Sequence, residues 1–264
     1  MTLGPGSPRE AEALARLYDL DLSEDPGDLD LYRALAARTG GPILELATGS
    51  GRLAVPLAEA GYPVTGLDLD PAMLDRARSS AGTAGPEVEA RLTWVEGDLV
   101  DARLAEAGSF RLAFIALNSL LVLGSRDAQR AALRTLAAHL APGGVAVVDV
   151  WQPDGEDLAR FDGRLILEWG RIDPATGRQV TKVASAQHDA ASQSVTLTTL
   201  YEEGEPGRPA DRWLRTDRMR LVSADELEGL AEDAGLEVEI LAGGYDLEPV
   251  GAGSERAVLV AVRP

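Results

Sequence analysis

The stretch that decides the fold is Ile43-Leu44-Glu45-Leu46-Ala47-Thr48-Gly49-Ser50-Gly51-Arg52. It begins with a short apolar run, which predicts a buried strand, and continues into a glycine-rich turn. A helix is predicted at 53–60, ending at Gly61. Glycines in such a turn let the backbone approach a ligand, and the N-terminus of the following helix favours an anionic group. Taken alone, the pattern is weak evidence for a nucleotide-like ligand.

Strands and helices alternate along the chain around this stretch. Helical spacing covers 8–39, with a break near 23–27, and recurs at 71–78, 126–140 and 223–234. Apolar segments typical of buried strands occupy 64–69, 92–95, 111–117, 145–150, 236–241 and 257–262. Strands separated by helices predict a parallel sheet with right-handed crossovers.

The pattern changes between 164 and 221. Period-2 segments occur at 165–169, 179–187, 194–201 and 213–221, with turn sequences between them, and they predict antiparallel strands. Helical periodicity then returns, so the segment is an insertion. We predict an N-terminal helical cap at 1–40, a core at 41–152 and 222–264, and an antiparallel β insertion at 153–221.

Acidic residues stand at the ends of successive predicted strands. Asp68 follows Glu45 by 23 residues, and Asp98 lies just after the third strand. A carboxylate at position 68 can accept both hydroxyls of a ribose, and one at position 98 can accept an adenine amino group. Each residue alone is equally typical of a loop or a helix cap. Because ligands bind at the carboxyl ends of parallel strands, the joint placement favours one nucleoside-like ligand.

With these motifs the chain resembles the class I S-adenosylmethionine-dependent methyltransferases. The similar segments are 45–52, 64–74, 96–98, 110–118 and 140–144. The resemblance implies an α/β fold: a seven-stranded Rossmann-like methyltransferase sheet with its last strand antiparallel, and an antiparallel β-sheet inserted after strand 5. It also implies S-adenosyl-L-methionine as the cofactor. The residues implied to bind it are Tyr18, Glu45, Ala47, Thr48, Gly49, Gly51, Arg52, Asp68, Leu69, Met73, Gly97, Asp98, Leu99 and Leu117.

The chain departs from the family pattern at two places. Ala47 stands where the first glycine of the motif is usual, and we expect cofactor binding to survive the added methyl group. Relatives often carry a histidine just after the matching Asn-Ser, whereas Leu121 and Val122 stand here. Asn118 and His188 remain as weak candidates for a catalytic group. We expect His188 at an exposed strand end and His139 on the surface.

The segment 17–21 and the insertion resemble small-molecule N-methyltransferases of amino-sugar and glycopeptide pathways. In that group a tyrosine of the N-terminal helices closes over the cofactor, a role that falls to Tyr18. The acceptor pocket is expected between the carboxyl edge of the sheet and the insertion, which would roof it. Aromatic walls with polar edges suit an amine, although they also serve as packing. The candidate acceptor residues are Asn118, Ser119, Trp151, Gln152, Trp169, Tyr201, Arg212 and Trp213.

Composition limits the chemistry. The 264 residues include no cysteine and two histidines, so thiolate and multi-histidine metal sites are excluded, and we expect no metal. A net charge of −18 disfavours nucleic acid and anionic membranes as partners. It reflects either compositional bias or a field that attracts cationic ligands. With no signal segment and no apolar run of membrane length, we expect a cytoplasmic monomer or homodimer.

The expected reaction is transfer of the methyl group to a small-molecule acceptor by in-line displacement, most simply to an amine, which needs no strong base. An oxygen or carbon acceptor is the alternative. A nicotinamide oxidoreductase is a further alternative, although the third glycine of G-x-G-x-x-G is missing after Gly51. A non-catalytic cofactor-binding protein is the last.

Overall fold

The computed structural model describes residues 7–24, 26–205 and 207–264. The chain forms two compact units. Unit 1 comprises Met1–Glu24, Val122–Gly124 and Pro153–Leu221, and unit 2 comprises Asp25–Leu121, Ser125–Gln152 and Val222–Pro264.

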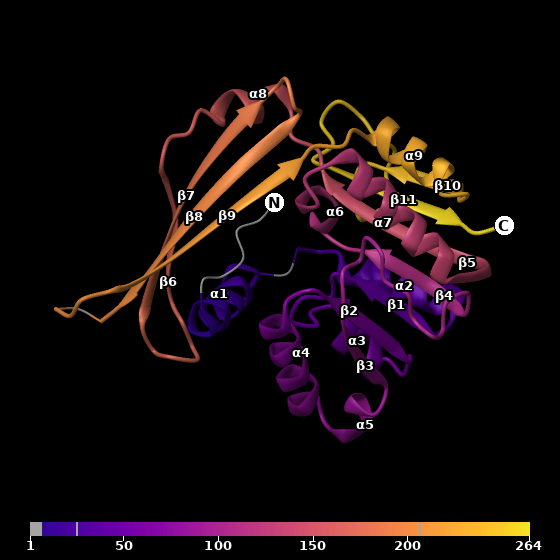
Figure 1. Cartoon of the computed structure of the whole chain (residues 1–264), viewed down its shortest axis with the longest axis horizontal. Helices are drawn as coiled ribbons and strands as arrows, with labels where there is room; N and C mark the ends of the chain where they lie inside the picture. Colours follow the sequence, from indigo (N-terminus) through magenta and orange to yellow (C-terminus); the bar gives the residue numbers. More distant parts are fainter. Residues whose placement is uncertain (1–6, 25, 206) are drawn as a thin grey trace. The chain divides into compact units, whose positions relative to one another are not determined.

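Unit 2 contains a seven-stranded sheet in the order β10-β11-β5-β4-β1-β2-β3 (Figure 1). Neighbouring strands from β5 to β3 pair in parallel, whereas β11 is antiparallel to both β5 and β10. The predicted seven-stranded sheet with an antiparallel last strand is therefore confirmed. The strands are β1 Ile43–Leu46, β2 Val64–Asp68, β3 Leu92–Glu96, β4 Phe110–Ile115, β5 Leu140–Trp151, β10 Glu237–Ala242 and β11 Arg256–Val262.

Helices connect these strands, and α4, α7 and α9 begin at side-chain caps. Asp70 accepts the amide of Ala72 at the start of α4, and Ser125 and Ser223 cap α7 and α9 in the same way. The apolar face of each long helix is buried, as in α4, where Met73, Leu74, Ala77 and Ala81 are buried. The helices are α2 Leu29–Thr39, α3 Ala54–Glu59, α4 Pro71–Ala84, α5 Pro86–Glu89, α6 Ser119–Val122, which crosses into unit 1, α7 Arg126–His139 and α9 Ala224–Asp233.

The two largest boundary differences from the sequence prediction concern α4 and β5. Helix α4 continues to Ala84 instead of ending at 78, because Ala81 is buried and Gly85, with φ +110°, ends the helix. Strand β5 begins at Leu140 instead of 145. Its pairing with β4 slips near Gly144, where a Cβ would lie 2.8 Å from the Phe110 carbonyl oxygen. Short helices α5, α6 and α8 were not predicted.

The expectation of a surface His139 is wrong. Its side chain is 2% exposed, and Nδ1 lies 2.7 Å from the Thr135 carbonyl oxygen. The Leu104 amide donates to Nε2 across 3.1 Å. The connection between β3 and β4 supplies this donor. A helix pattern read locally does not reveal that a distant loop covers the end of α7.

Unit 1 contains the insertion and the first helix. The four strands form one antiparallel sheet in sequential order, which confirms the predicted inserted sheet. Leu17 and Leu20 of α1 pack against Val180 and Tyr201 of this sheet. Helix α1 thus groups with the insertion and α2 with the seven-stranded sheet; the borders at 40, 152 and 222 stay predictions. The elements are α1 Pro8–Asp21, α8 Gly155–Arg160, β6 Ile166–Ile172, β7 Gln179–Asp189, β8 Ser194–Gly204 and β9 Asp211–Arg220.

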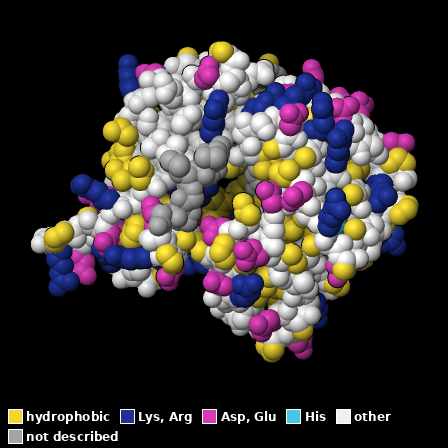
Figure 2. Space-filling view, viewed as in Figure 1, with side chains coloured by type: hydrophobic (Ala, Val, Ile, Leu, Met, Phe, Trp, Pro, Cys, Tyr) yellow, Lys and Arg dark blue, Asp and Glu magenta, His cyan; other side chains and the backbone are white. Residues whose placement is uncertain are grey.

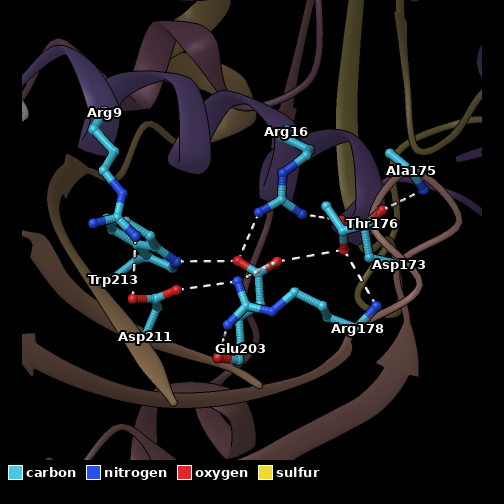
Figure 3. Close-up of polar contacts among 9 residues, drawn as sticks. All are labelled: Arg9, Arg16, Asp173, Ala175, Thr176, Arg178, Glu203, Asp211 and Trp213. Atoms are coloured by element: carbon cyan, nitrogen blue, oxygen red, sulfur yellow. Dashed lines mark hydrogen bonds and ion pairs between the residues drawn. The ribbon is translucent and has the colours of Figure 1, made fainter. Parts of the chain in front are cut away.

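A buried polar network also joins α1 to this sheet (Figure 3). Glu203 of β8 is 1% exposed, and its Oε2 accepts from Arg16 at 2.7 Å and from the Trp213 indole at 3.3 Å. Arg178 lies 3.4 Å from Oε1 of the same carboxylate. Arg16 also pairs with the buried Asp173. Since a buried charge is tolerated only when it is paired, Glu203 is the central residue of this network.

We expect Glu203→Ala to destabilise unit 1 by about 3–5 kcal/mol, because Arg16 and Arg178 lose a buried partner. Glu202→Ala on the same strand is the matched control, since Glu202 is 46% exposed and pairs with Arg212, also exposed. Its cost should stay below about 1 kcal/mol. Urea unfolding and amide exchange of α1 measure both variants. Equal effects of the two substitutions would contradict the role of Glu203.

Candidate active site

The glycine-rich turn after β1 has a left-handed backbone at Ala47, Gly49 and Gly51, with φ of +61°, +56° and +81°. For Ala47 this conformation costs more than for glycine, which agrees with the glycine usual at this position. Thr48 closes the turn, because its amide donates to the Leu67 carbonyl at 2.9 Å and its hydroxyl donates to Glu45 at 2.7 Å. The turn is therefore held against both β1 and β2.

Asp68, at the end of β2, connects the turn to the next helix. One carboxylate oxygen accepts the Gly49 amide at 2.7 Å, and the other accepts the Asp70 amide at 2.9 Å. Burial raises the pKa of Asp68 above its ordinary value, although these amide donors act to lower it. Each carboxylate oxygen has a second lone pair for an outside donor, so binding of a ribose diol by Asp68 stays a prediction.

The space around the turn suits a close-lying ligand. A Cβ on Gly66 of β2 would lie 2.8 Å from the Thr48 hydroxyl, and a Cβ on Gly51 would lie 3.0 Å from the Trp94 ring of β3, so the turn packs closely onto β2 and β3. A Cβ on Gly49 would meet nothing within 4 Å, which leaves the outer side of the turn open. Next to Asp68, Leu69 is 66% exposed and offers an apolar side chain to a planar group. The donor, acceptor and apolar groups at this edge fit a nucleoside ligand.

Other residues expected to bind the cofactor lie along the same edge. The Gly97 amide donates to the Asp68 carbonyl at 3.0 Å. Asp98 is exposed and accepts the Val100 amide at 2.9 Å, whereas Leu99 and Met73 are buried. The structure thus brings these residues to the ends of β2 and β3, and their ligand contacts stay predictions.

Arg52 forms a bidentate ion pair that the sequence did not predict. Both terminal nitrogens donate to Asp28 at 2.6 Å, and Asp28 is fully buried. Asp28 precedes α2, far along the chain from the glycine turn, and no local pattern connects it with Arg52. The pair fixes the guanidinium beside the turn.

Asp149 of β5 is a second residue that sequence reasoning missed. It is fully buried, and its Oδ1 accepts from the Tyr32 hydroxyl at 2.8 Å and from the Leu117 amide at 2.9 Å. Its Oδ2 accepts from the Tyr245 hydroxyl at 2.9 Å and pairs with Arg256. Burial raises the pKa of both phenols, so they remain protonated donors at neutral pH.

Four predicted acceptor residues lie near the carboxyl ends of β4 and β5. The Trp151 amide donates to Oδ1 of Asn118 at 2.9 Å, which fixes the orientation of the Asn118 amide. Gln152 donates to the Val222 carbonyl at 2.8 Å. Ser119 begins α6 and is half-buried. Because the amide oxygen of Asn118 accepts from Trp151 of β5, its NH2 group, a hydrogen-bond donor, is directed away from β5.

The remaining candidates belong to unit 1. Trp169 and Trp213 are half-buried against α1, and the Trp169 indole donates to Asp21 at 2.8 Å. Tyr201 is buried in the same cluster, Tyr18 is half-buried on α1, and Arg212 is exposed. His188 is half-buried near the end of β7, where its amide donates to the Phe161 carbonyl. The two tryptophans thus contribute to the packing of unit 1, and a contact of any of these residues with an acceptor stays a prediction.

The sheet order of unit 2, its glycine turn after β1 and the acid at the end of β2 define a Rossmann-like methyltransferase. Residues 43–144 match the family model described as "Methyltransferase domain". The chain belongs to the S-adenosylmethionine-dependent methyltransferases. With this family, S-adenosyl-L-methionine is the cofactor, and the alternative of a nicotinamide oxidoreductase falls away.

Relatives support the same conclusion over most of the chain. A cypemycin N-terminal methyltransferase from a Streptomyces species is 30% identical over 236 residues, covering 88% of this chain and 86% of the relative. A dTDP-3-amino-3,4,6-trideoxy-alpha-D-glucopyranose N,N-dimethyltransferase from Streptomyces venezuelae is 27% identical over 238 residues, covering 87% and 92%. The solved CcbJ methyltransferase from Streptomyces caelestis aligns with a TM-score of 0.75 at 27% identity, covering 90% of each chain.

Within the described residues, no helix is long and apolar enough to cross a membrane. The same part of the chain contains no group of three or more His, Cys, Asp or Glu side chains arranged to hold a metal ion.

We expect the stability of the ligand-free protein to fall as pH rises from about 4.5 to about 8 on account of Glu45. Burial raises the pKa of Glu45 from 4.5 to about 8, so folding retains a proton that the unfolded chain releases. Between these two pKa values, the free energy of unfolding falls by about 1.4 kcal/mol per pH unit. This slope returns to zero once the pH exceeds the pKa of Glu45 in the folded state. Glu45→Gln should flatten this part of the stability–pH curve measured by urea unfolding; an unchanged slope would refute the prediction.

We expect Asp68→Ala to weaken S-adenosylhomocysteine binding about ten- to a hundredfold, or roughly 1.5–3 kcal/mol, because a charged acceptor is lost. Asp70→Ala is a control for helix capping alone, since Asp70 accepts the Ala72 amide. Isothermal titration calorimetry measures both affinities. Unchanged affinity in folded Asp68→Ala would remove this residue from the cofactor site.

Proposed function

We propose that this enzyme transfers a methyl group to the nitrogen of a small amine, with catalysis resting on alignment of the reactants. The observation that carries the proposal is that carboxyl groups at the carboxyl edge of unit 2 are already hydrogen-bonded within the protein. Asp28, Glu45, Asp68 and Asp149 are each bonded to groups of the protein. An amine brings its own lone pair and needs no strong base, whereas a hydroxyl acceptor usually needs one.

S-adenosylmethionine, when bound, supplies an electrophilic methyl group on a sulfonium whose leaving group is a neutral thioether. The glycine turn and Asp68 would hold the nucleoside part, with Leu69 against the base. Leu117 and Asn118, at the end of β4, would face the reacting centre. Fixing reactants in line can lower a barrier by about 7–11 kcal/mol.

Asn118 would act as a hydrogen-bond donor and not as a base. Its carbonyl oxygen accepts the Trp151 amide, so the group left for a ligand is the NH2. A donor of this kind can hold a carboxylate, a hydroxyl or a carbonyl of a ligand. It would leave the lone pair of the acceptor amine free for attack. This orientation supports a positioning role for Asn118 within the proposed reaction.

The ion pairs of unit 1 favour an acceptor without a phosphate. On the face shown in Figure 2, basic side chains are interspersed with acidic ones. A diphosphate would compete with carboxylates that already pair with arginines, whereas a peptide or metabolite amine would not. The arginines of unit 1 paired in this way include Arg9, Arg16, Arg171, Arg178, Arg212 and Arg215.

The test is an assay of S-adenosylhomocysteine formation with product mass analysis. One arm uses short peptides with a free α-amine, a second uses a dTDP-3-amino sugar, and a third uses matched alcohols. A mass gain of one methyl on an amine supports nitrogen as the acceptor atom, and a gain on the dTDP-3-amino sugar alone would contradict an acceptor without a phosphate. Transfer only to oxygen or carbon refutes the proposal, as does cofactor binding with no transfer to any acceptor of a broad panel.

We further expect full activity in the presence of a chelator. The activity of His188→Ala should stay within about tenfold of wild type. Loss of a general base costs 10²–10⁴. The rate should rise with pH as the acceptor amine loses its proton, and this profile should persist in the variant. Gln187→Ala, one residue earlier on β7, is the matched control. A thousandfold loss in folded His188→Ala alone would identify a base and favour a hydroxyl acceptor.

A further inference from the structure

We infer that Asp149 is a positioning residue for methyl transfer: through its bond to the Leu117 amide it fixes the turn that carries Asn118. The inference rests on the proposed function, because Asn118 matters only if this edge of the sheet carries the reaction. It assigns Asp149 no contact with either reactant.

The first observation is a pair of anchors from one strand. Asp149 and Trp151 are two residues apart on β5. The Asp149 carboxylate accepts the Leu117 amide at 2.9 Å, and the Trp151 amide donates to the Asn118 side chain at 2.9 Å. Two successive residues after β4 are thus held by a single neighbouring strand, one through its backbone and one through its side chain.

The second observation is the backbone of Leu117. Its φ of +53° is a conformation that a leucine rarely adopts. Such a residue persists only where surrounding contacts determine it, and it is typical of functional sites. A bond from the Leu117 amide to a fixed acceptor is the contact that can impose it. Without this acceptor the leucine should return to an ordinary backbone conformation, and Asn118 would turn with it.

The third observation is how firmly Asp149 itself is fixed. Tyr32 comes from α2, Tyr245 from the connection between β10 and β11, and Arg256 from β11. The Arg256 guanidinium also lies over the Tyr245 ring, 5.1 Å from its centre. Among the described residues, its buried Nε has no hydrogen-bond partner. Asp149 therefore supplies the main compensation for this cation, and its carboxylate cannot move without breaking several bonds.

The test variant is Asp149→Leu, which keeps the approximate shape and removes both the charge and the oxygen that accepts the Leu117 amide. Tyr245→Phe is the matched control, because it removes one donor from Oδ2 and leaves the Leu117 bond on Oδ1 intact. In the ligand-free protein, we expect amide exchange of 113–121 to rise at least tenfold in Asp149→Leu and to stay near wild type in Tyr245→Phe. This readout holds whether or not an amine proves to be the acceptor.

Steady-state kinetics give the second readout. We expect kcat to fall at least a hundredfold in Asp149→Leu, with S-adenosylhomocysteine affinity within about threefold of wild type. Adding Leu117→Gly to this variant should restore at least tenfold in kcat, because glycine adopts φ +53° without strain. If the single variant does not fold, Asp149→Leu with Arg256→Met removes both charges together and takes its place.

Three outcomes overturn the inference: unchanged exchange at 113–121, a kcat loss matched by Tyr245→Phe, or no rescue by Leu117→Gly. A failure of the proposed function is distinct. In that case no amine is methylated by the wild-type enzyme, while the exchange measurement still decides whether Asp149 holds the turn.

Discussion

The structure of unit 2 depends on carboxylates buried at the carboxyl edge of a parallel sheet. Desolvation makes each of them costly, and each is compensated by protein donors aimed at it. Asp149 receives four such donors, and Asp28 receives a bidentate arginine. Apart from the Arg256 pair, which joins the paired strands β11 and β5, these bonds connect segments that no strand pairing connects. Because of these bonds, the turns and strand ends at this edge of the sheet have fixed positions, and so do the hydrogen-bond donors that they carry.

The same principle explains the backbone at the candidate site. Ala47 and Leu117 both adopt positive φ, and both lie just after a central strand. The turn after β1 is closed by Thr48 and Asp68, and the turn after β4 is held from β5. Strain at these places is thus matched by hydrogen bonds of the turn, as expected where a backbone must face a ligand.

The sequence predicted what local patterns encode. The inserted sheet and the residues of the glycine turn follow from periodicity and glycines, whereas the strand order and the antiparallel last strand follow from the motif resemblance. What it missed depends on contacts between distant segments. His139 looked like a surface residue because the loop that covers it lies 35 positions away, at Leu104. Asp149 looked like part of an apolar strand, and its donors come from positions 32, 117, 245 and 256.

The same difference between local patterns and distant contacts distinguishes the edge of unit 2 that suits the cofactor from unit 1. The groups suited to the cofactor follow one another along the chain at the ends of β1, β2 and β3, so a short stretch of sequence is enough to indicate the family. Unit 1 is built differently: α1 is joined to the inserted sheet by Glu203, Asp173 and Lys182, which meet partners as far as 187 positions away. Its aromatic side chains pack with α1, and their contact with an acceptor stays a prediction. Replacing one charged side chain of this network would therefore require compensating changes across α1 and the sheet, because removal of one partner leaves the others with an unpaired buried charge.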